Sequence, residues 1–536
     1  MKNKFQNTYI YIIIIYIKLL IMSRLDLSNS IHNFDIDIPK DPLCLPKDPL
    51  CLPKDPLCLS KDPLCLSKDP LCLSKLKIDE PHILLPVKNP QSELFDPNLL
   101  ETCNEIIDPI YNTIQISFLA NSIINTLIFQ SLRDKKQLGA CFMYIPTAVH
   151  NRFSHSLGVY NLAKKVMKLL KKKQPELHIT DRDIEIVGIA GLVHDLGHGP
   201  YSHMFETYLK KNGTNFCHEN MSIVLLKYIV EHDNINLTEQ EIISIEHMIK
   251  GNIPPYDIAK TFMYCIVSNK ETGIDVDKFD YIQRDCYFTG NKYMFNYKNL
   301  INNCRVINNK ICYNEDQIDN IYELFRSRFL MFKHVYMNGV NKGIELMIMD
   351  IISNLGPIIS IQDHINDPEK FYKLTDNYII SLVEYFSHVQ GENNIALNIL
   401  NNMKKGKIYT VIVEEKWEPK NEYKNLTCND IMDDIIKFCN NTIINNDLRI
   451  EIFEINFGKG NKNPLKSVDF YDNNNINASK KLAKINNILI PTKVSEKTIR
   501  IYITDPFNTH KIRKIKKAYY NMCEKYVGKR YESLDK

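Results

Sequence analysis

The chain has no excess of charge of either sign: its 536 residues include 67 Lys and Arg against 63 Asp and Glu, a formal net charge of +4. At this length so even a balance produces no strong field, which argues against a protein whose main role is to coat nucleic acid. Its 15 cysteines form no Cys-x-x-Cys pair, which excludes zinc-ribbon and thioredoxin-type sites. Ten of them are scattered from Cys103 to Cys523, which suits buried thiols in a reducing compartment better than a disulfide scaffold.

Beyond residue 22, the sequence lacks an apolar run long enough to span a bilayer, which takes about 20 residues. Residues 9–22 (YIYIIIIYIKLLIM) follow Lys2 and Lys4 and are typical of a signal peptide or anchor. Lys18 interrupts this run, and no small-residue cleavage site follows it. We therefore expect a dispensable leader over 1–22, with membrane or secretory targeting as the alternative, and no membrane contact for the core.

Residues 40–74 repeat the heptad Lys-Asp-Pro-Leu-Cys-Leu-(Pro or Ser) five times. A proline in every heptad argues against a coiled coil, because each one removes a backbone donor and clashes with the preceding turn. We expect an extended tether over 23–85. Metal binding or oxidation of its evenly spaced cysteines is the alternative to a permissive linker without chemistry of its own.

Helical periodicity dominates from Pro86 to about residue 350. The longest segments with apolar residues three and four apart are Asn161–Lys171, Asp183–His198 and Gln317–Ile352. After Ser360 the pattern is mixed, with β-like runs and a closing basic helix at Ile408–Glu414, Leu448–Asn456, Thr498–Thr504 and Lys511–Tyr526. We predict a mainly α protein, with an all-helical core over 86–395 and a smaller mixed α+β lobe over 396–536.

Histidine and acidic residues concentrate in four stretches: 150–158 (HNRFSHSLG), 191–206 (GLVHDLGHGPYSHMFE), 217–219 (CHE) and 275–285 (DVDKFDYIQRD). The second stretch holds three histidines and an aspartate within ten residues. It ends a helix that is apolar nearly all round and that Thr180 and Asp183 would open as a capping box. An unpaired aspartate at the end of such a buried helix would be costly, so it needs partners.

A divalent metal site would provide those partners. Adjacent helical residues point about 100° apart, so His194 and Asp195 can converge on one ion from two directions. His155 and Asp277 are the natural further ligands from separate helices. Mixed histidine and aspartate ligation suits iron, zinc, manganese or magnesium rather than a thiolate-bound structural zinc. A single histidine here would default to a packing residue; the cluster favours a metal.

These residues resemble a known family. His155, the His194-Asp195 pair and Asp277 match the H…HD…D pattern of the HD-domain metal-dependent phosphohydrolases. Four longer motifs are similar to the sterile-alpha-motif and HD-domain dNTP triphosphohydrolases: HNRFSHSLGV, AGLVHDLGHGPYSHMFE, VSNKETGIDVDKFDYIQRD and YKLTDN. The resemblance covers roughly 105–525 and lacks the sterile-alpha-motif domain. It implies hydrolysis of dNTPs to deoxynucleoside and triphosphate, and control of the deoxynucleotide pool. The scattered cysteines suit a reducing compartment, so we expect a location in nucleus or cytoplasm.

The resemblance also implies a role for each site residue. The metal ligands would be His155, His194, Asp195 and Asp277, with magnesium accompanying the nucleotide phosphates. In the catalytic group, His203 would be the general acid, and His198 and His218 would contact phosphate. Glu206 would orient one of these imidazoles. Phosphates would meet Arg152, Lys278, Tyr281 and Arg328. The 3′ hydroxyl would meet Gln137 and Asp285, while the 2′ position would be crowded by Leu138 and Tyr336.

Regulation by guanine nucleotides is a further implication of the resemblance. GTP or dGTP would bind between subunits and convert a dimer to a homotetramer. Gln130 and Arg133 match guanine-reading positions, but Asn125 stands where the family has aspartate. A carboxylate accepts from both guanine donors, whereas an amide offers one acceptor and one donor. The change at Asn125 therefore weakens the case for guanine-nucleotide activation, but not the case for catalysis.

Two other functions are compatible with parts of the sequence. One is another HD-type phosphohydrolase, either a nucleoside monophosphate phosphatase or a phosphodiesterase. The other is a non-catalytic nucleotide sensor or single-strand nucleic-acid binder. The basic run Lys511–Lys517 (KIRKIKK) offers the latter some surface, although the solvated face of an amphipathic helix explains it more simply. A complete ligand set argues against an inactive enzyme.

Overall fold

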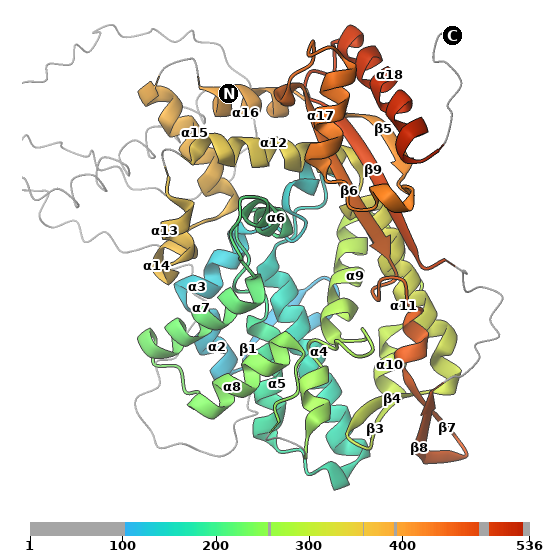
Figure 1. Cartoon of the computed structure of the whole chain (residues 1–536). Coiled ribbons are helices and arrows are strands. Elements are labelled where there is room, and N and C mark those ends of the chain that lie inside the picture. The colour runs from blue at the N-terminus through green and yellow to red at the C-terminus, as the bar shows by residue number, and fades with distance from the viewer. Residues whose placement is uncertain (1–101, 256–258, 357–358, 391–393, 482–492, 529–536) are drawn as a thin grey trace, which may run out of the picture. The chain divides into compact units, whose positions relative to one another are not determined.

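The computed structural model describes residues 102–255, 259–356, 359–390, 394–481 and 493–528 (Figure 1). The leader and the repeat tether expected over 1–22 and 23–85 lie outside these residues. The described residues all belong to one of the chain's two units, Glu93–Lys536. Within them, no helix has both the length and the apolar composition needed to cross a membrane.

Three helices form the centre of the fold. Helix α4 (Arg152–Lys173) packs along α5 (Asp181–Val193) and α9 (Val276–Thr289), and all three are visible in the middle of Figure 1. The α5 helix opens with the expected capping box, in which Thr180 and Asp183 exchange side-chain to backbone hydrogen bonds. Every residue from Ile184 to Val193 is buried, which is why the helix is apolar nearly all round.

Further helices surround this centre. Before α4 and between α5 and α9 these are α2 (Phe118–Ile124), α3 (Leu127–Gln130), α6 (His203–Lys211), α7 (His218–His232) and α8 (Glu239–Lys250). After α9 they are α10 (Tyr297–Asn302), α11 (Ile318–Met331), α12 (Gly339–Leu355), α13 (Ile361–Ile365), α14 (Pro368–Phe371), α15 (Asp376–Gln390) and α16 (Ile395–Lys404).

Three small sheets complete the described part. The first is an antiparallel hairpin, β1 (Thr102–Asp108) with β2 (Asn112–Ser117). The second has the order β3-β4-β7-β8, with bounds Cys304–Ile307, Lys310–Asn314, Asp469–Asp472 and Asn475–Lys481. The third is antiparallel with the order β5-β9-β6, with bounds Thr410–Lys416, Ser495–Ile503 and Leu448–Asn456.

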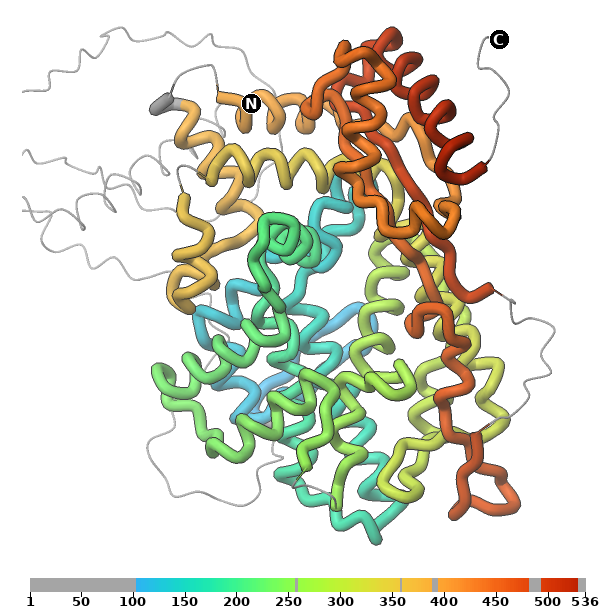
Figure 2. Tube along the Cα trace, in the orientation of Figure 1, coloured from blue at the N-terminus to red at the C-terminus, as the bar shows by residue number. Residues whose placement is uncertain are grey.

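The third sheet carries a hydrophobic core of its own. Helices α17 (Cys428–Phe438) and α18 (Thr509–Tyr526) pack on it around the buried Trp417. The second sheet instead links distant segments, since β7 pairs in parallel with β4 (Figure 2). These sheets and helices confirm the prediction of a mainly α protein with a mixed α+β C-terminal region. The boundary at 395 and 396 stays a prediction.

Two local expectations were wrong. The segment expected as one helix over Gln317–Ile352 is two helices, α11 and α12. A short π-helix at Phe332–Tyr336 continues α11, and the chain then breaks at Met337 and Asn338, where Asn338 caps the start of α12. The core expected to be all-helical also contains strands: 102–117 forms the β1–β2 hairpin, and 304–314 forms the antiparallel β3–β4 pair. Asp108 stabilises its turn by accepting hydrogen bonds from the backbone N–H groups of Ile110 and Tyr111.

Candidate active site

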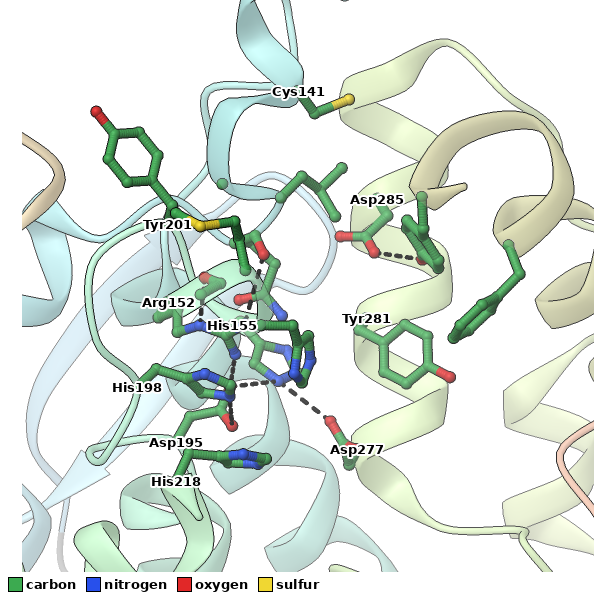
Figure 3. Close-up of a pocket in the computed structure, with 18 of the residues that line it drawn as sticks. Cys141, Arg152, His155, Asp195, His198, Tyr201, His218, Asp277, Tyr281 and Asp285 are labelled. Carbon is green, nitrogen blue, oxygen red and sulfur yellow. Dashed lines mark hydrogen bonds and ion pairs between the residues drawn. The ribbon is translucent and has the colours of Figure 1, made fainter. Parts of the chain in front are cut away.

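A cavity of about 660 Å³ opens where α4, α6, α7, α9, α11 and α12 converge (Figure 3). Its lining includes every residue that the sequence analysis assigned to the metal or the substrate, together with the three assigned histidines. Glu206 is outside the lining and lies behind His218. Residues more than 190 positions apart in the sequence therefore meet at one site.

Two histidines and two carboxylates face one point in this cavity. His155 Nε2 lies 3.4 Å from an oxygen of Asp195 and 3.2 Å from an oxygen of Asp277. His194 Nε2 lies 3.4 Å and 3.5 Å from oxygens of the same two residues. His155 comes from α4, Asp277 from α9, and the His194-Asp195 pair from the turn that follows α5. Figure 3 shows His155, Asp195 and Asp277 pointing toward one another.

The Nδ1 atoms of His155 and His194 already have hydrogen-bond partners. His155 Nδ1 is hydrogen-bonded to Asp280 at 2.7 Å, and His194 Nδ1 to the carbonyl of Gly191 at 2.8 Å. His194 Nε2 is buried and makes no hydrogen bond within the described part of the chain. This arrangement leaves both Nε2 atoms for an ion, as in histidine metal ligands held through their second nitrogen. The residues present therefore fit a divalent metal.

The electrostatics of this group favour a cation. Burial by itself lowers the pKa of His155, but hydrogen bonds with Asp277 and Asp280 outweigh it and raise the pKa to about 10. For Asp195, burial raises the pKa, yet the charge of Arg152 holds it well below its usual range. Carboxylates that attract a proton to the ring will equally attract a divalent cation in its place.

Arg152 ties this group to the next loop. Its guanidinium donates to Asp195 through Nη1 and to Ser202 Oγ through Nε, the latter at 2.9 Å. The side chain is 2% exposed. The guanidinium therefore pairs with Asp195 and also contacts Ser202, the residue that precedes His203.

Three more histidines form the adjoining wall. The rings of His198 and His218 are stacked with centroids 4.0 Å apart, and His203 stands perpendicular to His198 at 4.8 Å. His218 Nδ1 is hydrogen-bonded to Glu206 at 2.5 Å. Burial raises the pKa of Glu206, but its hydrogen bonds with His218 and Lys210 lower it to about 2. The carboxylate is therefore ionised and fixes the orientation of His218.

The surroundings of the other two imidazoles of this wall favour their neutral form. Burial and the positive charge of Arg152 lower the pKa of His198 well below its ordinary value and that of His203 to about 3. His203 is exposed to the cavity, whereas His198 is buried. Together, the wall offers neutral N–H donors directed at a space beside the metal group.

The opposite wall comes mainly from α9 and the π-helix. Tyr336 donates its hydroxyl hydrogen to Asp285 at 2.5 Å, and His150 holds the other oxygen of Asp285 at 2.7 Å. Lys278 pairs with Asp275 at 2.8 Å. Gln137 is buried, and its Oε1 has no hydrogen-bond partner within the described residues.

Helix α12 adds residues that sequence reasoning missed. Asn341, Lys342 and Glu345 also line the cavity. Lys342 Nζ and Glu345 lie 2.6 Å apart, and Asn341 is 2% exposed. The sequence did contain a signal for these residues: Asn341, Lys342 and Glu345 are polar residues at neighbouring positions of a helix that is otherwise mostly apolar and buried. Asp280, which is hydrogen-bonded to His155 Nδ1, was likewise not assigned to the site from the sequence.

The residues assigned to guanine recognition lie outside the cavity lining. Asn125 ends α2 and is exposed, and Gln130 Nε2 donates to the carbonyl of Ile124 at 2.7 Å. Gln130 Oε1 accepts from Arg133 Nε at 2.7 Å, and that guanidinium lies 3.6 Å from the centroid of the Phe153 ring. The structure thus gathers the three residues in one short segment next to α4.

Comparison with known proteins agrees with this site. The HD domain family model matches residues 152–285, which span the metal and histidine groups. The deoxynucleoside triphosphate triphosphohydrolase SAMHD1 homolog of Dictyostelium discoideum is 33% identical, covering 74% of this chain and 76% of its own length. SAMHD1 of Gallus gallus is 34% identical (74% and 71%), and that of Homo sapiens 32% (75% and 71%). The chain belongs to the SAMHD1 family of HD-domain deoxynucleoside triphosphate triphosphohydrolases.

Proposed function

We propose that this chain hydrolyses dNTPs to deoxynucleoside and inorganic triphosphate, and thereby controls the deoxynucleotide pool in the nucleus or cytoplasm. One observation carries the proposal: a single cavity joins a histidine-aspartate metal group, a histidine wall and a closely packed edge for a sugar. Its volume of about 660 Å³ is within the range of sites that enclose a molecule of nucleotide size.

The metal is proposed to bind to His155, His194, Asp195 and Asp277. Their nitrogen and carboxylate donors suit iron, zinc, manganese or magnesium. When bound, such an ion polarises a phosphoryl oxygen and lowers the pKa of a water molecule. Asp280 and Gly191 would hold the two imidazoles in the orientation that presents Nε2.

The histidine wall is proposed to handle the leaving group. Water attacks the α-phosphorus, the bond to the 5′ oxygen breaks, and that oxygen must gain a proton. His203 would supply it. Its pKa is about 3 in the free protein, but the negative charges of a bound triphosphate would raise that pKa toward neutrality. His198 would donate to phosphate oxygens alongside His218, whose far nitrogen is presented by the Glu206 contact.

The phosphate chain would be neutralised from both sides of the cavity. Arg152 approaches from α4, Lys278 and Tyr281 from α9, and Arg328 from α11, while magnesium would accompany the phosphates. Arg328 Nη1 donates to the carbonyl of Asn456, and its Nε is buried with no hydrogen-bond partner in the described residues. That N–H is available to a phosphate oxygen.

Selection of deoxyribose is proposed to rest on four residues. Gln137 and Asp285 would hydrogen-bond the 3′ hydroxyl. Tyr336 is fixed by its bond to Asp285 and, with Leu138, would occupy the space that a 2′ hydroxyl needs. Rejection of ribonucleotides would then arise from a clash rather than from a missing contact.

Activation and assembly form the regulatory part of the proposal. GTP or dGTP would bind at Asn125, Gln130 and Arg133 and would stabilise a homo-oligomer, from dimer to tetramer. The Gln130–Arg133 hydrogen bond supports a prearranged edge for a base. The exposed amide of Asn125 provides one acceptor, not two, so a high activator concentration would be needed.

The test is an analysis of products from the purified chain with each dNTP, with manganese or magnesium, with and without GTP. Deoxynucleoside plus triphosphate is expected. Asp277→Ala should abolish the reaction, whereas Asp233→Asn, which removes an exposed carboxylate, should leave it unchanged. Release of pyrophosphate or single phosphate would indicate a different HD phosphohydrolase, and binding without turnover would indicate a sensor.

A further inference from the structure

A buried carboxylate on α15 lies between the two loops that carry the proposed general acid and the proposed sugar contact. Asp376 is the first residue of α15 and is 2% exposed. It belongs to the motif YKLTDN, to which the proposed chemistry gives no role. Its carboxylate bonds neither metal ligand nor histidine; both oxygens accept from the backbone instead.

The two backbone partners belong to different loops. Asp376 Oδ2 accepts from Lys136 N–H at 2.9 Å, and Oδ1 accepts from Tyr201 N–H at 2.6 Å. The Tyr201 hydroxyl donates in return to the backbone carbonyl of Asp376 at 3.2 Å. Gln137 directly follows Lys136, and His203 is the second residue after Tyr201. One carboxylate therefore fixes the spacing between these two loops.

The loop before His203 needs such support because its backbone is strained. Tyr201 and Ser202 have φ values of +57° and +60°, which are uncommon for residues other than glycine. Conformations of this kind persist only when the surroundings fix them, and they cluster at functional sites. Ser202 Oγ donates to the Lys136 carbonyl at 2.7 Å, so the same two loops are joined a second time.

The loops also touch backbone to backbone. Gly139 has φ of +53°, and a Cβ there would lie 2.8 Å from the carbonyl oxygen of Tyr201. A small shift of either loop would therefore move both. The backbone of Tyr201 and Ser202 sets the position of His203, which is the first residue of α6.

We propose that Asp376 is a positioning residue for the reaction, holding the His203 loop and the Gln137 segment at their catalytic separation. The inference rests on the proposed function, which gives those two residues their roles. An ionised carboxylate accepts both N–H groups. An asparagine can accept only one of them, and its NH₂ group faces the other donor. Asp376→Asn therefore loosens one loop without changing the size of the side chain.

The charge state of Asp376 offers a readout that a merely structural role would not move. Burial raises the pKa of this carboxyl to about 6, although the two N–H groups and the charges of Lys136 and Lys135 oppose the rise. Burial also lowers the pKa of Lys135 to about 7, and burial raises that of the Tyr201 phenol. Below about pH 6 the protonated carboxyl has a hydroxyl that faces an N–H donor, as the asparagine amide does.

The experiment compares kcat for the wild type and D376N from pH 5 to pH 8. At pH 8 we expect D376N to be slower by about 10- to 100-fold, the cost of misplacing a reacting group. The ratio of the two rates should fall toward one below pH 6, because the wild type then loses the same bond. Titrating groups away from Asp376 are common to both proteins and cancel in the ratio. Lys135 does not cancel, because the charge of Asp376 raises its pKa and D376N removes that charge. A ratio of one at pH 8, or a ratio that does not change with pH, would overturn the proposal.

A matched control and a second measurement keep the result interpretable. Asp367→Asn removes the capping carboxylate of the neighbouring helix α14, which accepts from Glu369 N–H, and should leave kcat unchanged at every pH. Amide hydrogen exchange should be faster in D376N at residues 135–139 and 199–203 only. If D376N does not fold, Asp376→Glu replaces it; its longer carboxylate should also lower kcat.

The experiments distinguish failure of the proposed dNTP hydrolysis from failure of the proposed role of Asp376. If the wild type releases no triphosphate from any dNTP, that function is wrong and the exchange measurement alone decides. Faster amide exchange confined to the two loops would then support the proposal that Asp376 holds them together, and unchanged exchange in D376N would refute it.

Discussion

Replacing Asp280 by asparagine tests how far the metal group depends on residues behind it. Asp280 is fully buried on α9 and accepts from His155 Nδ1 at 2.7 Å. It also accepts two hydrogen bonds from Arg284, at 2.8 and 2.9 Å. All of these partners are donors, so the NH₂ group of an asparagine must face one of them. D280N therefore disturbs His155 or leaves Arg284 poorly paired.

The structure sets the size of the expected effect. Burial raises the pKa of Asp280, but Arg284 and His155 outweigh it and lower the pKa to about 2 from an ordinary 3.8. That difference is equivalent to about 2 kcal/mol of stabilisation of the ionised form. Removing one partner of a buried ion pair costs about 3–5 kcal/mol, and the upper end is not expected because Arg284 keeps Asp108 at 2.8 Å. We expect a loss of about 2–4 kcal/mol in the free energy of unfolding.

The second effect concerns the metal. Loss of a carboxylate that orients a histidine ligand weakens metal binding by about 10- to 100-fold. The assay is a titration of metal-free D280N with manganese or zinc against a chelator, together with thermal unfolding, and Asp233→Asn as the control for loss of one carboxylate. If D280N bound metal as tightly as the wild type and unfolded at the same temperature, the reasoning that Asp280 supports His155 would be refuted.

Three further substitutions test the other parts of the site. His203→Asn should lower kcat by about 10²- to 10⁴-fold while dNTP still binds by equilibrium dialysis, and near-normal kcat would remove His203 as the general acid. Leu138→Ala should raise the rate with ribonucleoside triphosphates relative to dNTPs in a competition assay, because it opens the 2′ position; unchanged selectivity would contradict the clash. Asn125→Asp should lower the GTP concentration needed for half-maximal activation and shift sedimentation toward larger oligomers, and an identical GTP response would remove Asn125 from the activator site.

Much of the site was predictable from the sequence because its chemistry is local. His194 and Asp195 are adjacent in the sequence. The buried helix before them is predictable from its capping box and from its mostly apolar residues. The strand expected at Leu448–Asn456 was confirmed with the same bounds, since its alternation and flanking Asn-rich turns are local signals too.

The rest depends on contacts between distant segments. Helical periodicity continues through Phe332–Tyr336, so nothing in the pattern shows that the π-helix there turns Tyr336 toward Asp285. The role of Asp376 was not visible, because its partners Lys136 and Tyr201 lie 240 and 175 residues away. A helix-starting aspartate has an ordinary local explanation, and only the fold reveals that its carboxylate faces inward.

The central claim is that this chain cleaves the bond between the α-phosphorus and the 5′ oxygen of a dNTP. The most direct test is turnover in water labelled with heavy oxygen, followed by mass spectrometry of both products. The account predicts one labelled oxygen in the released triphosphate and none in the deoxynucleoside. Label in the deoxynucleoside, or release of labelled pyrophosphate or single phosphate in place of triphosphate, would contradict it.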